Sequence, residues 1–341
     1  MEALDYGGDD VDKLYLVTGA SGHLGNTVVN KLCAAGCNVR ALVLPGEENI
    51  SDCKESFFGD VRDKESLSAF FSNPANNELI VIHTAGIISV SSWYDRNVYA
   101  VNVNGTRNII ELCKKSNVSK LIHVSSVHAI PEKPAGQIIT ETTEFSSARV
   151  KGFYAKTKAE ATAYVLDSQK EIHVSVVHPS GICGPYDFGL GHLTALVIDY
   201  CSGGLKAIVR GGYDFVDVRD VADGIISCCE HGKNGECYIL SNKYFTVQEI
   251  MRTLHEITGK KEIKLVLPHW LAASTASLAE LYYKILHKPP LYTSYSLYTL
   301  RSNSLFSHEK ADKELGYSVT DMTKTLFDTV EWLAHCNRIK L

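Results

Sequence analysis

Tyr154 and Lys158 form a pair whose residue types and spacing could carry out proton transfer. They lie in Gly152-Phe-Tyr-Ala-Lys-Thr-Lys-Ala-Glu-Ala161, a proline-free segment rich in alanine and lysine, which predicts a helix. Residues four apart share a helix face. The pKa of a free phenol is about 10, and a fixed ammonium beside it would favour the phenolate. The pair predicts a general acid/base, although Tyr-x-x-x-Lys by itself also fits an exposed lysine beside a tyrosine.

A glycine-rich turn follows the first predicted strand. Lys13-Leu-Tyr-Leu-Val-Thr18 is a short apolar run that fits a strand buried on both faces. Gly19-Ala-Ser-Gly22-His-Leu-Gly25 comes directly after it, and a helical pattern follows through Val28, Val29 and Leu32. Glycines let the backbone approach a pyrophosphate, and a helix N-terminus offers unpaired N–H groups. This order of elements therefore predicts a dinucleotide site.

The end of the second predicted strand bears on the choice between NAD and NADP. An acidic residue at this point binds the 2′-hydroxyl of the adenosine ribose, and a basic residue accommodates a 2′-phosphate. Residues 38–44 form the strand, and its last residues, Val43 and Leu44, are neither acidic nor basic. Glu47 and Glu48 follow and would repel a phosphate, so the sequence leans weakly to NAD. Arg40 or Lys54 could reverse that preference.

Further apolar runs alternate with helical patterns along the next 120 residues. The runs cover residues 57–60, 79–84, 121–126 and 172–178, with a helix predicted from a cap near Asp63 and an edge strand predicted at 236–240. Asp217 and Thr246 are predicted helix caps, and Gly259 is predicted to end the second of these helices. This alternation predicts an α/β fold with a parallel sheet covered on both faces. Ligands of such sheets bind at the carboxyl ends of the strands, where the motifs fall.

Composition excludes several classes of function. The chain has 341 residues, 45% hydrophobic and 21% charged, with a net charge of −5, which is typical of a soluble protein that does not bind nucleic acid. No apolar run is long enough to span a membrane, and residues 1–12 are predicted to be a disordered tail without a signal peptide. The ten cysteines follow neither a disulfide nor a zinc pattern, which favours reduced thiols, a cytoplasmic location and no metal.

Together these motifs resemble the short-chain dehydrogenases/reductases. Further segments resemble the extended branch of that family, which includes dihydroflavonol reductases, 3β-hydroxysteroid dehydrogenases, and nucleotide-sugar epimerases and dehydratases. These segments are Val101-Asn-Val-Asn-Gly-Thr106, His178-Pro-Ser-Gly-Ile-Cys-Gly-Pro185 and Phe215-Val-Asp-Val-Arg-Asp-Val-Ala222. The resemblance implies a Rossmann-type, doubly wound domain (13–180 plus 215–241) and a smaller, mostly helical substrate lobe (181–214 plus 242–341). It is compatible with a homodimer.

The resemblance also implies roles for individual residues. Tyr154 would be the proton donor or acceptor, Lys158 would hold the nicotinamide ribose, and Ser126 would hydrogen-bond the substrate oxygen. Ser125 competes for that last role, but neighbours on a strand face opposite ways, and the branch normally uses the second serine. The expected cofactor-binding residues, besides Tyr154 and Lys158, are Gly19, Ser21, Gly22, His23, Leu24, Gly25, Asp60, Val61, Thr84, Ala85, Gly86, Asn102, Ser125, Pro179 and Ile182.

The histidines near these motifs are predicted to have structural roles rather than to bind metal. His83, His123, His173 and His178 lie in or at the ends of apolar strands and are predicted to be hydrogen-bonded packing residues. His128, two residues after Ser126, is interpreted as a surface hydrogen-bonding residue, with contact to substrate as the alternative.

Three functions follow from the sequence and the resemblance. The first is an NAD(P)-dependent oxidoreductase acting on a ketone, an aldehyde or a secondary alcohol, with an apolar, non-nucleotide substrate favoured by residues 293–308 and their surroundings. The second is a nucleotide-sugar epimerase with tightly bound NAD; a dehydratase is discounted because Val127 and His128 stand where an acidic residue would be needed. The third is a non-catalytic dinucleotide sensor, which is disfavoured because such proteins typically lose the tyrosine or the lysine.

Overall fold

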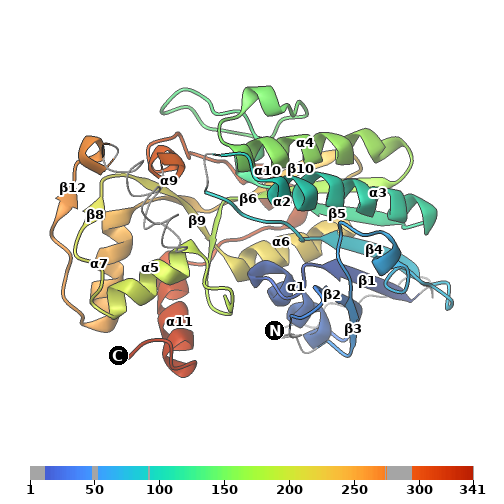
Figure 1. Cartoon of the computed structure of the whole chain (residues 1–341), viewed down its shortest axis with the longest axis horizontal. Coiled ribbons are helices and arrows are strands. Elements are labelled where there is room, and N and C mark those ends of the chain that lie inside the picture. The colour runs from blue at the N-terminus through green and yellow to red at the C-terminus, as the bar shows by residue number, and fades with distance from the viewer. Residues whose placement is uncertain (1–11, 48–52, 91–92, 273, 275–293, 341) are drawn as a thin grey trace.

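A seven-stranded parallel sheet forms the centre of the larger part of the molecule. The computed structural model describes residues 12–47, 53–90, 93–272, 274 and 294–340 (Figure 1). The strand order is β10-β6-β5-β4-β1-β2-β3, and each neighbouring pair is parallel. The strands are β1 (Lys13–Thr18), β2 (Asn38–Val43), β3 (Glu55–Phe58), β4 (Glu78–His83), β5 (Lys120–Val124), β6 (His173–Pro179) and β10 (Glu236–Leu240). Parallel pairing requires both faces to be covered, which explains the continuous apolar runs.

Helices cover both faces of this sheet. On one face α1 (His23–Ala34) and α6 (Val218–His231) pack into a buried cluster, and α10 (Glu309–Leu315) joins them from near the C-terminus. On the opposite face lie α3 (Thr106–Lys115) and α4 (Phe153–Asp167), whose apolar residues form a second cluster with the strands (Figure 1). The predicted doubly wound α/β fold is therefore confirmed, including the predicted edge strand, β10.

A smaller region follows the last residues of β6. Its helices α5 (His192–Cys201), α7 (Val247–Thr258) and α11 (Met322–His335) share one buried cluster (Figure 1). A three-stranded sheet of β7 (Gly181–Cys183), β9 (Gly212–Asp217) and β11 (Lys243–Thr246) joins this cluster to the large sheet, and β8 (Ile208–Val209) pairs with β12 (Val266–Leu267). The boundaries of the two predicted lobes stay a prediction.

Helix caps in this region agree with the sequence patterns. The Asp217 carboxylate accepts a hydrogen bond from the Arg219 backbone N–H at the start of α6. Thr246 and Glu249 form a reciprocal capping box at the start of α7, and Gly259 ends that helix in the left-handed conformation. Both predicted caps and the predicted stop are confirmed.

The segment after the third strand differs from its prediction. Strand β3 ends at Phe58, and the expected helix near Asp63 is only one 3₁₀ turn, Glu65–Leu67. The Ser66 hydroxyl hydrogen-bonds the backbone of Asp60 and Asp63, and side-chain bonds of this kind compete with a regular helix. The sequence also predicts that Pro289-Pro290 breaks two helices, and these prolines lie outside the described residues.

Candidate active site

The glycine turn between β1 and α1 packs closely against its own backbone and that of Ala85, which only residues without side chains allow. Gly19 has φ +69°, and a Cβ there would lie 2.8 Å from the Ala85 backbone. A Cβ on Gly25 would lie 2.1 Å from the Gly19 carbonyl oxygen. Gly22 caps α1 without any side-chain hydrogen bond, so the cap itself leaves the first N–H groups of the helix available to a ligand. These residues fit a dinucleotide pyrophosphate.

Other predicted members of the turn have partners within the chain. The Ser21 hydroxyl donates to Glu47, which follows β2. His23 Nε2 lies 2.8 Å from the carbonyl oxygen of Pro185, in the loop after β7, and burial lowers the pKa of this histidine. Leu24 packs against the core on the α1 face. The turn is thereby held between the end of β2 and the loop after β7.

Several residues expected to bind the cofactor follow the ends of β3 and β4. The Asp60 carboxylate accepts hydrogen bonds from the Arg62 backbone and guanidinium, and these bonds hold its pKa below the usual range. Val61 is buried against α3 residues. Thr84 donates to the Thr18 carbonyl oxygen at 2.6 Å, and the Ala85 N–H donates to the Thr18 hydroxyl at 3.3 Å. These two hydrogen bonds therefore hold the residues after β4 against the end of β1.

Lys158, Asn102 and Gly86 meet beneath the tyrosine. Lys158 Nζ donates to the Val124 carbonyl oxygen at 2.9 Å, and burial lowers its pKa to about 8. Asn102 lies in a π-helical turn, Ala100–Gly105, and its amide bonds the backbone of Ile87 and the Thr157 hydroxyl. A Cβ on Gly86 would lie 3.2 Å from Lys158 Nζ and 3.4 Å from Asn102 Oδ1. Single π turns are frequent at functional sites.

The two candidate serines point in different directions. The Ser125 hydroxyl lies 2.6 Å from the Thr162 hydroxyl of α4 and is buried there. Ser126 starts the turn after β5 and accepts a hydrogen bond from the His128 backbone N–H at 3.2 Å, and its hydroxyl is the neighbouring group that lowers the pKa of Tyr154. This geometry favours Ser126 as the serine that would face a substrate. Pro179 ends β6, and Ile182 lies on β7 next to the core, at the same edge of the sheet.

The pKa of Tyr154 does not behave as the sequence predicts. Burial raises it to about 12, and the hydrogen bond to Ser126 opposes this rise. Lys158 is not among the groups that shift the pKa of Tyr154, and burial lowers its own pKa to about 8. The predicted lowering of the Tyr154 pKa by Lys158 is therefore not observed, and Ser126 is the neighbouring group that favours the phenolate.

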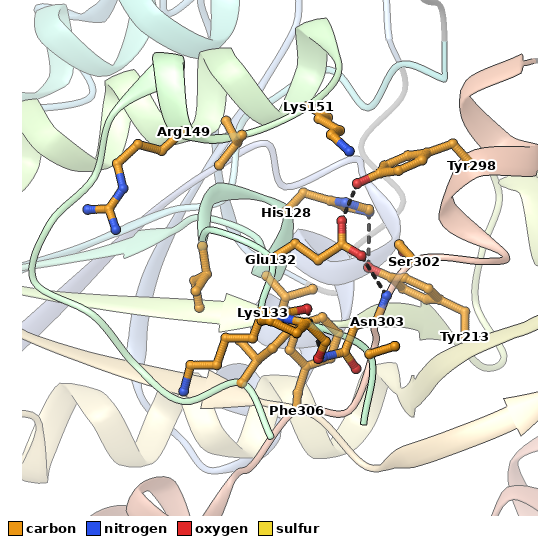
Figure 2. Close-up of a pocket in the computed structure, with 16 residues that line it drawn as sticks. His128, Glu132, Lys133, Arg149, Lys151, Tyr213, Tyr298, Ser302, Asn303 and Phe306 are labelled. Atoms are coloured by element: carbon orange, nitrogen blue, oxygen red, sulfur yellow. Dashed lines mark hydrogen bonds between the residues drawn. The ribbon is translucent and has the colours of Figure 1, made fainter. Parts of the chain in front are cut away.

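A cavity of about 420 Å³ lies next to the turn that follows Ser126 (Figure 2). Its wall includes Val127 and His128 from the serine turn, Lys151 from the segment before α4, and Tyr213 from β9. Residues Tyr298, Ser302, Asn303 and Phe306 complete it from the C-terminal run that the sequence associates with substrate. The wall is partly apolar and partly charged, and its size is that of a small-molecule site.

His128 is hydrogen-bonded, as the sequence predicts, but it is half-buried and does not lie at the open surface. Its ring is enclosed by tyrosines: Tyr213 Oη lies 3.1 Å from Nε2 and Tyr295 Oη lies 3.4 Å from Nδ1. Burial lowers the pKa of this histidine to about 4. Tyr213 and Tyr295 come from β9 and α9 (Ser294–Thr299), so no local pattern around His128 signals them.

Three buried histidines lie on adjacent strands below the lysine. His83 and His123 are register partners with ring centroids 5.4 Å apart, and His178 Nδ1 lies 3.0 Å from the Ser126 carbonyl oxygen. His83 is hydrogen-bonded as predicted, but among the described residues neither ring nitrogen of His123 has a partner, which contradicts its interpretation as hydrogen-bonded. Burial lowers the pKa to about 3 for His83 and about 4 for His178, and well below 6.5 for His123.

These histidines predict loss of stability in acid. Folding lowers the pKa values of these histidines, so the folded protein binds fewer protons than the unfolded chain below about pH 6.5. The free energy of unfolding therefore falls as the pH drops from there toward 4, by roughly 1.4 kcal/mol per pH unit for each histidine. Lys158 is the nearby charge that lowers the pKa of all three. We expect His123→Leu to reduce this slope by about one proton and to cost little at pH 7.5, as measured by urea unfolding at several pH values. An unchanged slope would contradict this assignment.

Two other structural findings concern classes of function. No helix among the described residues is long and apolar enough to cross a membrane. Within those same residues, no three His, Cys, Asp or Glu side chains are grouped so that they could hold a metal ion.

Comparison with known proteins gives a consistent result. The model of the NAD dependent epimerase/dehydratase family matches residues 15–241. Sterol demethylase protein B of Methylococcus capsulatus is 28% identical, over 93% of this chain and 97% of its own. A putative dihydroflavonol 4-reductase of Synechocystis is 27% identical, over 96% of both chains. The crystal structure of gox2253 superposes with a TM-score of 0.80 at 29% identity, over 96% of this chain and 99% of that one.

Proposed function

Because the chain belongs to the NAD-dependent epimerase/dehydratase family, we propose that it is an NAD(P)-dependent oxidoreductase acting on a carbonyl or secondary alcohol. The observation that carries this proposal is the convergence of Ser126, Tyr154 and Lys158 at one edge of the sheet, beside the glycine turn. A bound nicotinamide would supply or accept the hydride. The similarity to a reductase over nearly the whole chain supports the oxidoreductase class.

The side chains have separate roles in this proposal. The Ser126 hydroxyl orients the substrate oxygen, and Tyr154 donates a proton to that oxygen in reduction or removes it in oxidation. Lys158 is fixed by the Val124 carbonyl oxygen and by its buried position, which supports a role for its amino group in holding the cofactor ribose. Asn102 fixes the backbone after β4 and the helix that carries the tyrosine.

The substrate that fits the cavity has an apolar body and polar substituents. Val127, Tyr213 and Phe306 offer apolar contact, and Glu132 is already engaged by Tyr298 Oη and the Asn303 N–H. The cations of the wall also have partners within the chain: Lys133 bonds the Ile138 carbonyl oxygen, Arg149 pairs with Glu144, and Lys151 lies over the Tyr298 ring. This supports the sequence-based preference for a substrate with apolar surface.

A carbonyl-reduction assay tests the proposed activity. Protein purified without added cofactor is titrated with NADH and NADPH and then assayed with a panel of ketones and aldehydes at the nicotinamide absorbance band. Saturable binding followed by net oxidation of the cofactor is expected. A dinucleotide that copurifies with the chain and never turns over would instead favour the epimerase. Failure to bind either dinucleotide would contradict both.

The contacts around β2 support NAD as the preferred cofactor. Arg40, which could have bound a 2′-phosphate, is occupied: its guanidinium binds Glu55 and the Phe70 carbonyl oxygen. The Glu47 carboxylate instead lies at the glycine turn, bonded to Ser21. We propose that this carboxylate meets the adenosine ribose, where it would repel a 2′-phosphate.

Replacement of Glu47 tests that assignment. We expect Glu47→Arg to shift the ratio of kcat/KM for NADPH over NADH by about tenfold or more toward NADPH, since it exchanges a repulsive charge for an attractive one. Glu47→Gln, which removes the charge alone, should shift the ratio less. Equal ratios in all three proteins would exclude Glu47 from cofactor selection.

A further inference from the structure

His128, Tyr213 and Tyr295 form an aromatic array that no sequence motif predicts. Its ring stacks on Tyr213 with centroids 5.5 Å apart and an interplanar angle of 13°. Tyr295 approaches the same ring from α9, with centroids 6.0 Å apart. Each ring nitrogen therefore faces one phenol hydroxyl, at 3.1 Å for Tyr213 and 3.4 Å for Tyr295.

This aromatic array lies between the Ser126 and Tyr154 side chains and the cavity. The His128 backbone N–H donates to the Ser126 hydroxyl, and its ring meets Tyr154 edge to face at 6.0 Å. His128 and Tyr213 also line the cavity (Figure 2), whereas Ser126 and Tyr154 do not, and each of those two is only 7% exposed. A substrate whose body occupies this cavity and whose carbonyl reaches Ser126 must pass along the His128 ring.

Of the two tyrosine hydroxyls that contact the His128 ring, that of Tyr295 is the easier to replace. Its hydrogen bond to Nδ1 is the longer one, and it comes from a short helix, whereas Tyr213 belongs to a strand of the three-stranded sheet. The Tyr295 ring also lies against the residue that precedes α4, since a Cβ on Gly152 would come within 2.1 Å of it. Tyr295 thus covers both His128 and the start of the catalytic helix.

We propose that His128 determines substrate specificity, and that its Nδ1 exchanges the Tyr295 hydroxyl for a second, uncharged oxygen of the substrate close to the reacting carbon. This inference rests on the proposed oxidoreductase function and names its substrate class: hydroxyketones, diketones or the corresponding diols. A neutral imidazole presents one N–H and one lone pair, so it pairs with a hydroxyl or a carbonyl and offers no counter-charge to a carboxylate. Tyr213 fixes the ring through Nε2 while Nδ1 changes partner.

The test compares ketones that differ by one oxygen. Reduction of 2-hydroxyacetophenone is measured against acetophenone, and reduction of 2-hydroxycyclohexanone against cyclohexanone. The wild-type protein should favour the hydroxylated member of each pair by about tenfold or more in kcat/KM, because a site built to hydrogen-bond an oxygen rejects the analogue that lacks it. His128→Phe should reduce that preference to about twofold or less. Intrinsic reactivity cancels, because the same two ketones are compared in both proteins.

Conservative variants separate this role from a merely structural one. The amide of Asn lies where Nδ1 lies, and that of Gln lies nearer the position of Nε2, so His128→Asn should restore much of the preference and His128→Gln should not. Tyr295→Phe removes the competing hydroxyl and should lower KM for the hydroxylated ketones more than for their partners.

Two results would overturn the inference, and they differ from failure of the proposed function. If His128→Phe slows both members of each pair equally, the histidine only supports the fold of the site. If the wild-type protein reduces ketones without preferring the hydroxylated member, the substrate class is wrong while the oxidoreductase stands. If it reduces no carbonyl compound at all, the proposed function fails and this inference fails with it.

Discussion

A Tyr154→Phe variant is expected to lose roughly 10²- to 10⁴-fold in kcat while it folds and binds dinucleotide as the wild-type protein does. The substitution removes only the phenol oxygen, whose pKa Ser126 lowers, and leaves the ring in its buried position. A large loss of turnover with unchanged cofactor affinity would assign that oxygen to proton transfer. The measurement is steady-state turnover together with a separate titration of cofactor binding.

Tyr164→Phe provides a matched control on the same helix. Tyr164 lies on α4, ten residues after Tyr154, and its ring contacts the Arg107 guanidinium at 3.9 Å. Loss of that half-buried hydroxyl should change turnover by less than about threefold, because about 15 Å of helix separates Tyr164 from Tyr154. If Tyr154→Phe retained activity at the level of this control, Tyr154 would not be the acid/base.

The second large effect is expected at the glycine turn. Gly22→Val should raise the dissociation constant for NAD(H) by about a hundredfold or more, because a side chain there would stand where backbone must approach the pyrophosphate. The fold should tolerate the change: Gly22 has φ −75°, which valine adopts, and its Cβ would meet only the Gly19 carbonyl oxygen, at 3.3 Å. Cofactor binding and thermal unfolding are measured in parallel.

Graded substitutions distinguish loss of the site from loss of the fold. Gly22→Ala should weaken binding less than Gly22→Val, since its side chain is smaller. Gly25→Ala should instead destabilise the turn itself, because its Cβ would lie 2.1 Å from the Gly19 carbonyl oxygen. Wild-type affinity in a folded Gly22→Val protein would remove this turn from the cofactor site.

Features encoded by local spacing could be predicted from the sequence. The glycine turn between β1 and α1 and the Tyr154–Lys158 pair on α4 depend on residues within a few positions of one another. The apolar runs predicted the order of strands and helices, because a parallel sheet buries each strand on both faces. The short turn after Asp63 was missed because the side-chain bonds of Ser66 outweigh a helical pattern there.

Features built from distant residues could not be predicted. The partners of His128 are 85 and 167 residues away, so its enclosure by Tyr213 and Tyr295 has no local signal. The occupied state of Arg40 depends on Phe70, 30 residues later. The direction of the Tyr154 pKa depends on burial by the surrounding elements, which spacing on one helix does not express.

Transfer of deuterium from NADH labelled at C4 is the most direct test of the proposed oxidoreductase. The protein is incubated with each stereospecifically labelled form of the cofactor and a reducible ketone, and the product is examined by mass spectrometry. The account predicts one deuterium on the carbinol carbon of each product molecule, from one of the two forms only, with net oxidation of the cofactor. Product without the label, or an epimerised substrate with no net change in the cofactor, would contradict it.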